Sequence, residues 1–100
     1  MTLKANLKAA LARARGAEDH EFVFTWGQML VGVSQARSGY VTLRIERRDM
    51  APTDGDWDQV VAQWPEPGPI GVVPTPRTEG KRHALIGRWA RPAEVSQATQ

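Results

Sequence analysis

The chain has 100 residues, 41% of them hydrophobic, and its thirteen basic and eleven acidic residues leave a net charge of only +2. This length and hydrophobic content predict one globular domain with a modest core and argue against a disordered chain. The absence of cysteine excludes disulfides and thiolate metal sites, and no apolar run approaches the ~20 residues of a membrane helix. We therefore expect a cytoplasmic protein without a membrane partner, and the many alanines and arginines are typical of a GC-rich bacterial or phage genome.

Charge is distributed unevenly along the chain. Residues 1–17 carry four basic side chains and no acidic one, and residues 77–91 carry five basic side chains and one acidic one. Residues 49–66, by contrast, carry five acidic side chains and no lysine or arginine. The folded protein would thus have basic and acidic sectors, which can steer a charged partner or simply keep the protein in solution.

The first predicted element is a helix from about Leu3 to Arg15, with Thr2 as its N-cap and Gly16 as its end. Its apolar side chains recur at helical spacing in one narrow stripe, namely Leu3, Leu7, Ala10, Leu11 and Ala14. A helix of this length is marginal alone in water, so we expect the stripe to pack on the rest of the fold. The basic side chains leave a second interpretation open, in which the helix binds an acidic groove, a membrane surface or nucleic-acid phosphates.

The central prediction is a three-stranded antiparallel meander from Phe22 to Arg47. A tight turn at Gly27-Gln28 gives the opposed pairs Trp26–Met29, Phe24–Val31 and Phe22–Val33. A five-residue loop over residues 35–39 gives a second set of pairs: Ser34–Tyr40, Val33–Val41, Val31–Leu43 and Met29–Ile45. Together the two registers place nine apolar side chains on one face, and a slip of one residue would turn a strand over. We expect the opposite face to meet solvent or a partner.

A short helix is predicted after the meander, following a turn cluster at residues 51–55. It runs from about Asp56 to Trp64 and ends before Pro65. Four apolar side chains fall on one helical face, namely Trp57, Val60, Val61 and Trp64. We expect this face to pack in the core, with the acidic side chains of the first turn near the positive end of the helix dipole.

Residues 65–80 hold five of the seven prolines and predict an extended surface loop in which Ile70 and Val72-Val73 touch the sheet edge. An exposed polyproline ligand is the alternative for this loop. Residues 81–89 alternate well enough for a fourth strand, although Leu85, Ile86 and Trp89 also fit a helix. A strand is favoured because Gly87 would weaken a short helix, and Pro92 would end it.

These elements predict an α+β fold: helix, three-stranded antiparallel meander, short helix, Pro-rich loop and fourth strand, with the helices packed on one face of the sheet. One domain would span residues 1–92, and residues 93–100 would form a flexible tail.

Catalysis is not expected, because the sequence lacks a phosphate-binding glycine loop, a nucleophile elbow and any close pair of histidines. We also expect no cofactor and no metal. A two-histidine site would require His20 and His83 to meet, with Asp19 or Glu21 beside them, if the last strand paired with the first.

Protein interaction is therefore the expected function, as an adaptor, an inhibitor or a regulatory subunit that binds another protein or forms a homodimer. The alternative is nucleic-acid binding by the basic polar face of the sheet, with arginines reading base edges and lysines holding phosphates. The candidate contacts for either partner are Arg37, Thr42, Arg44, Arg47, Arg48, Lys81, Arg82 and Arg88.

Overall fold

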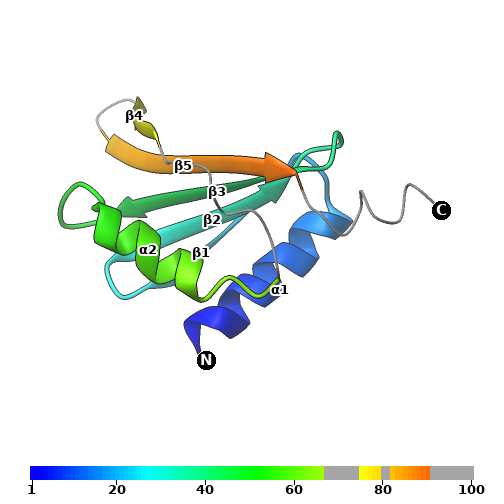
Figure 1. Cartoon of the computed structure of the whole chain (residues 1–100), viewed down its shortest axis with the longest axis horizontal. Coiled ribbons are helices and arrows are strands. Elements are labelled where there is room, and N and C mark those ends of the chain that lie inside the picture. Colours follow the sequence, from blue (N-terminus) through cyan, green and yellow to red (C-terminus); the bar gives the residue numbers. More distant parts are fainter. Residues whose placement is uncertain (67–74, 80–81, 91–100) are drawn as a thin grey trace.

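A computed structural model describes residues 1–66, 75–79 and 82–90 of the chain. In chain order its elements are α1 (Leu3–Gly16), β1 (Glu21–Trp26), β2 (Met29–Gln35), β3 (Tyr40–Arg47), α2 (Asp54–Ala62), β4 (Thr75–Glu79) and β5 (Arg82–Ala90). The strands form one antiparallel sheet in the order β1-β2-β3-β5-β4 (Figure 1). The expected α+β fold is confirmed. The predictions for Ile70, Val72-Val73, Pro92 and the tail at residues 93–100 lie outside the described residues.

Both helices start where a threonine side chain accepts a backbone hydrogen bond. Thr2 Oγ1 accepts from the N–H of Ala5 at 3.1 Å, as predicted for the N-cap of α1. In α2, the Thr53 hydroxyl accepts from the N–H of Asp56, and the Asp56 carboxylate accepts from the N–H of Thr53. This reciprocal capping box starts α2 two residues earlier than its apolar spacing had indicated.

The first hairpin has the predicted register. Trp26 pairs with Met29, and the pairing continues residue by residue to Glu21 and Ser34. Gly27 has a φ of +60°, the left-handed conformation that a tight hairpin turn requires.

The second hairpin was predicted wrongly by two residues. Val33 pairs with Leu43 rather than Val41, Val31 with Ile45 rather than Leu43, and Met29 with Arg47 rather than Ile45. The turn is shorter than expected, because Ala36 N–H donates to the Tyr40 carbonyl and Gly39, at a φ of +96°, donates to the Ala36 carbonyl. An even shift leaves every side chain on its predicted face.

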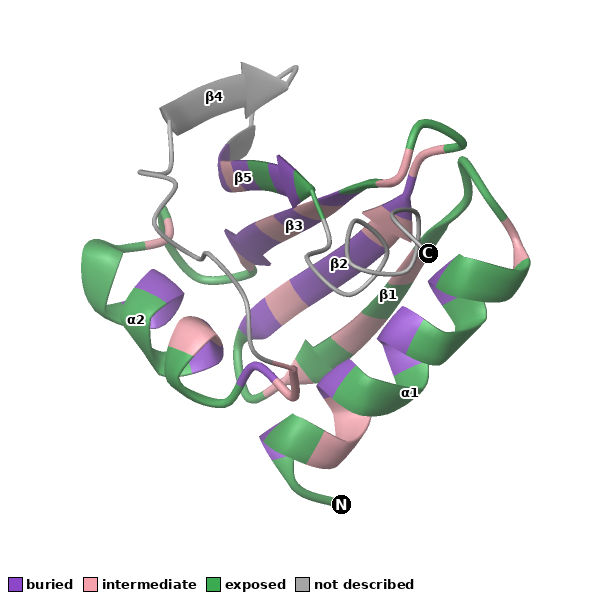
Figure 2. Ribbon diagram, turned by 45° about the vertical axis from the view of Figure 1, so that its right-hand side comes forward, coloured by how far each residue is buried: buried purple, intermediate pink, exposed green. Residues whose placement is uncertain are grey.

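The core lies between the helices and one face of the sheet (Figure 2). The apolar stripe of α1 packs against β1 and β2, as the sequence predicted. Trp57 of α2 packs against Gly87 of β5. Just beyond the end of α2, the Trp64 ring meets the Trp89 ring edge-on, with centroids 5.0 Å apart. Fully buried side chains from the middle of the sheet complete this layer, namely Val31, Val33, Val41, Leu43 and Ile45.

The predicted fourth strand is β5, and it pairs with β3 on one side. On its other side it pairs with β4, a fifth strand that the sequence did not predict. β4 falls within the proline-rich segment and contains Pro76, yet it lies at the edge of the sheet, the position where a strand tolerates proline.

Candidate interaction surface

One face of the sheet is left uncovered by the described helices, because α1 and α2 both lie on the other side (Figure 2). We call this uncovered side the open face. It carries several apolar side chains: Val23 is 50% exposed, Tyr40 is 45% exposed, and Leu30 and Ile86 are half-buried. An apolar surface broken by polar groups is typical of a protein-binding surface.

At the centre of the open face, the Arg44 guanidinium bridges two carboxylates. Its Nε and Nη2 donate to the two carboxylate oxygens of Glu21 at 2.8 and 2.7 Å, and its Nη1 donates to Glu46. Glu46 is almost completely buried, and the Arg44 guanidinium compensates the charge of its carboxylate within the sheet. The central cation of the predicted contact set is thus already bound by two acids.

Gly32 makes this bridge possible, because Glu21 lies on β1 and Arg44 on β3, with β2 between them. The Glu21 side chain crosses β2 over Gly32, which faces Arg44 in the sheet register. A Cβ atom at Gly32 would lie 2.4 Å from Glu21 Oε2, so any larger residue would occupy the path of the glutamate. The glycine therefore forms a shallow channel for the ion pair.

A second arginine of the predicted set, Arg47, is bound by two acids where β3 leads toward α2. Its Nε and Nη2 donate to Asp49, and its Nη1 donates to Asp56, all at 3.0 Å. The hydrogen bonds from Arg47 lower the pKa of the Asp49 carboxyl below its ordinary value of 3.8, and the same contacts raise the pKa of Arg47. Arg47 thus ties the end of β3 to the capping box of α2.

The other predicted contacts are divided between the two ends of the sheet. Arg37 lies in the β2–β3 turn, and the exposed Arg88 stacks over the Tyr40 ring, 5.2 Å from its centroid, at that same end. Exposed Arg48 lies at the other end, where its N–H donates to the Gln28 carbonyl. The eight residues of β3, roughly 25 Å of strand, separate the two ends. Thr42 lies between them, half-buried; Lys81 and the Arg82 side chain lie outside the described residues.

Two residues that organise the open face, Glu21 and Gly32, were missing from the predicted contacts. The pairing of Gly32 with Arg44 would have pointed to both residues. The predicted β2–β3 register placed Thr42 opposite Gly32 instead, so the pairing was not recognised.

The two-histidine hypothesis is wrong in its geometry, because β5 pairs with β3 and β4, while β1 lies at the far edge of the sheet. The His20 ring contacts the Glu18 carbonyl at 3.2 Å through Nδ1. Among the described residues, no group of three or more acidic, histidine or cysteine side chains could hold a metal ion. Within the same part of the chain, no helix is both long and apolar enough to cross a membrane.

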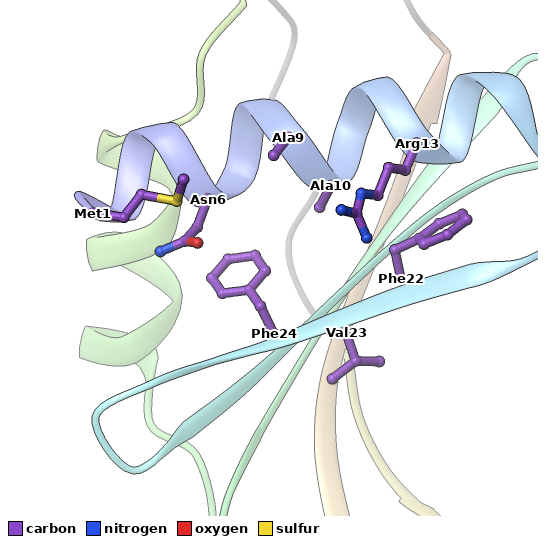
Figure 3. A pocket seen from close by; sticks show the side chains of 8 residues that line it. All are labelled: Met1, Asn6, Ala9, Ala10, Arg13, Phe22, Val23 and Phe24. Carbon is purple, nitrogen blue, oxygen red and sulfur yellow. The ribbon is translucent and has the colours of Figure 1, made fainter.

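A groove runs along the outer edge of the sheet, between α1 and β1, with a volume of about 250 Å³. Phe22 and Phe24 rise from β1 toward the helix, and Arg13 reaches down from α1 between them, whereas Val23 points the opposite way (Figure 3). Both phenylalanines are only partly buried, so the core is incompletely closed along this edge.

Comparisons of the chain with protein-family models, with curated proteins and with solved structures found no match.

Proposed function

We propose that this chain is a small, non-catalytic protein-interaction module that binds a partner protein through the open face of its sheet. The observation that carries the proposal is the Arg44 bridge. Because Glu21 and Glu46 compensate this cation, the centre of the face is polar without being strongly basic. Apolar side chains around such a centre match the composition of a non-obligate protein interface. A regulatory role in the cytoplasm, as an adaptor, inhibitor or subunit, is part of the proposal.

Nucleic-acid binding is the second candidate function, and the exposed Arg37 and Arg88 beside Tyr40 support it. A phosphate at Arg44 or Arg47, however, would have to displace a carboxylate that already accepts two hydrogen bonds from that arginine. Among the predicted contacts that the structure describes, the exposed arginines lie at opposite ends of the sheet rather than along one track. These features favour a protein partner.

The protein partner is tested by affinity capture from a nuclease-treated lysate, with captured proteins identified by mass spectrometry. Tyr40→Asp places a charge on the open face, and Met50→Asp is the matched control, because Met50 is an exposed apolar side chain outside the sheet. A partner bound by the open face would be retained by the wild type and by Met50→Asp, and lost from Tyr40→Asp. Equal retention by both variants, or no enriched protein, would contradict the proposal.

The nucleic-acid alternative is tested on the same purified proteins by fluorescence anisotropy with a labelled 20-base-pair DNA duplex. Binding that weakens steeply with salt, and weakens further in Arg37→Ala/Arg88→Ala, would support nucleic acid as the partner. Under our proposal the duplex binds only weakly at physiological salt, and the double variant behaves like the wild type.

A further inference from the structure

Strand β1 is an edge strand whose outer side meets no other strand within the described residues. In an antiparallel ladder, every second residue directs its N–H and C=O away from the neighbouring strand, so three of the six residues of β1 direct these backbone groups away from β2. The opposite edge differs, because β4 carries Pro76, which cannot donate to an added strand. Strand β1 contains no proline and no lysine, the residues that commonly block edge pairing.

The groove between α1 and β1 lies directly beside this edge (Figure 3). Its floor is formed by Phe22 and Phe24, and its wall by Ala9 and Ala10 of α1. Small alanines on the wall leave space above the two rings. A strand added outside β1 would direct alternate side chains to this side of the sheet, so its apolar residues would cover the partly buried phenylalanines.

The groove also indicates the charge of its occupant. Among the described residues that line the groove, Arg13 is the one with a charged side chain, and it forms no ion pair with another described residue. Helix α1 contains four basic residues and no acidic residue. A second copy pairing edge to edge would therefore bring two basic helices side by side, whereas an acidic segment would meet a complementary charge.

We propose that the β1 edge binds an extended peptide segment of a partner protein, apolar at alternate positions and carrying a carboxylate, which adds to the sheet as a sixth strand. Its backbone pairs with β1, its apolar side chains cover Phe22 and Phe24 beneath α1, and its carboxylate pairs with Arg13. This proposal shares with the proposed function only the assumption that the partner is a protein. The surface it uses is the β1 edge, not the open face.

The experiment selects ligands from a phage library of random twelve-residue peptides, with the full chain as bait. A synthetic copy of the most enriched peptide is then measured by fluorescence anisotropy against the wild type, Arg13→Glu and Arg15→Glu. Arg15 is the matched control, because it lies in the same last turn of α1 but does not line the groove. A second synthetic peptide, N-methylated at alternate residues, removes backbone donors without altering the protein.

We expect enriched peptides that combine alternating apolar residues with Asp or Glu. Arg13→Glu should weaken binding about tenfold, because attraction becomes repulsion, while Arg15→Glu should change it less than about threefold. N-methylation in the register that faces β1 should abolish binding. Failure to enrich any peptide, enrichment without acidic residues, or equal binding to both variants would overturn the proposal.

A light-scattering mass of two chains that returns to one when the selected peptide is added would also overturn it, by identifying a second copy as the occupant of the β1 edge. The open-face function is tested separately by Tyr40→Asp, which should leave peptide binding at the edge unchanged. The two proposals can therefore fail independently.

Discussion

The packing of Trp57 on Gly87 gives the sharpest stability prediction. Gly87 lies on the inner face of β5, opposite Leu43, and the Trp57 indole of α2 occupies the space that a side chain would fill. The substitution Gly87→Ala adds a single methyl carbon at that point. We expect it to lower the free energy of unfolding, although alanine is otherwise the better residue in a strand.

The magnitude follows from the distances. The added carbon would lie 2.5 Å from Cη2 and 2.8 Å from Cζ2 of Trp57. Non-bonded carbons rest about 3.5 Å apart, so the ring would have to move by roughly 1 Å. Trp57 is only 5% exposed, and it belongs to the same core cluster as Val60 and Trp64, so such a movement displaces α2. Overpacking of this kind costs about 1–3 kcal/mol.

Alanine gives the unfolded chain less conformational freedom than glycine does, which offsets about 0.5 kcal/mol of that cost. We therefore expect a net loss of about 0.5–2.5 kcal/mol, which corresponds to a Tm lowered by roughly 2–20 °C in a domain of this size. Urea denaturation followed by tryptophan fluorescence and a thermal melt followed by circular dichroism would measure it.

Gly16→Ala is the matched control, because no atom lies within 4 Å of the position of its Cβ and its φ is not positive. This variant should be as stable as the wild type or slightly more stable. Trp57→Phe removes the clashing ring atoms, so Gly87→Ala should cost less in the Trp57→Phe background than in the wild type. A Gly87→Ala protein as stable as Gly16→Ala would refute the packing argument.

Three further predictions concern the ion pairs. Thr53→Ala should lower the free energy of unfolding, measured by urea denaturation, by about 1 kcal/mol. Asp56→Ala should lower it by about 2–3 kcal/mol, because the Asp56 carboxylate also accepts a hydrogen bond from Arg47. Asp58 is exposed, so Asp58→Ala should change it by less than about 0.5 kcal/mol. Gly32→Ala should displace the flexible Glu21 side chain at a cost below about 1 kcal/mol, and its effect should vanish in a Glu21→Ala background, which lacks the side chain that crosses Gly32; additive effects would contradict the channel. Because Arg47 lowers the pKa of Asp49, this pair stabilises the fold above pH 3.8 and the contribution is lost as the pH falls through the lower folded-state pKa. Asp49→Asn should abolish that part of the acid destabilisation below pH 3.8, and the part is small because Asp49 is half-exposed.

The first hairpin could be derived from sequence because a single glycine determines it. Gly27 fits a tight turn in one register only, and that register pairs three apolar residues with three others. The second hairpin was ambiguous, because loops of three and five residues can both end at Gly39 and both preserve the side-chain faces. For the second hairpin, the sequence could therefore predict which face of the sheet each side chain occupies, but not which residues pair across the two strands.

That ambiguity hid the main feature of the candidate surface. With Thr42 opposite Gly32, nothing in the sequence brings Glu21 to Arg44, and the arginine looks available to a phosphate. With Arg44 opposite Gly32, the glutamate reaches it across the strand. Strand β4 was missed for a different reason: Pro76 argues against a central strand, but it does not exclude an edge strand.

Two glycines on opposite faces of the sheet thus give its surfaces different binding properties. Gly87 lets α2 close the inner face, and Gly32 lets Glu21 compensate the central cation of the open face. A partner held on the open face would contact side chains whose charges are largely paired, while a partner at β1 would bind through backbone groups together with one exposed arginine.

Because salt screens an exposed ion pair but leaves backbone hydrogen bonds intact, edge binding should lose only the Arg13 contribution at high salt. Residual binding of the selected peptide to the wild type in concentrated salt should therefore equal its binding to Arg13→Ala, and a difference between the two would mean that Arg13 acts by packing rather than by charge.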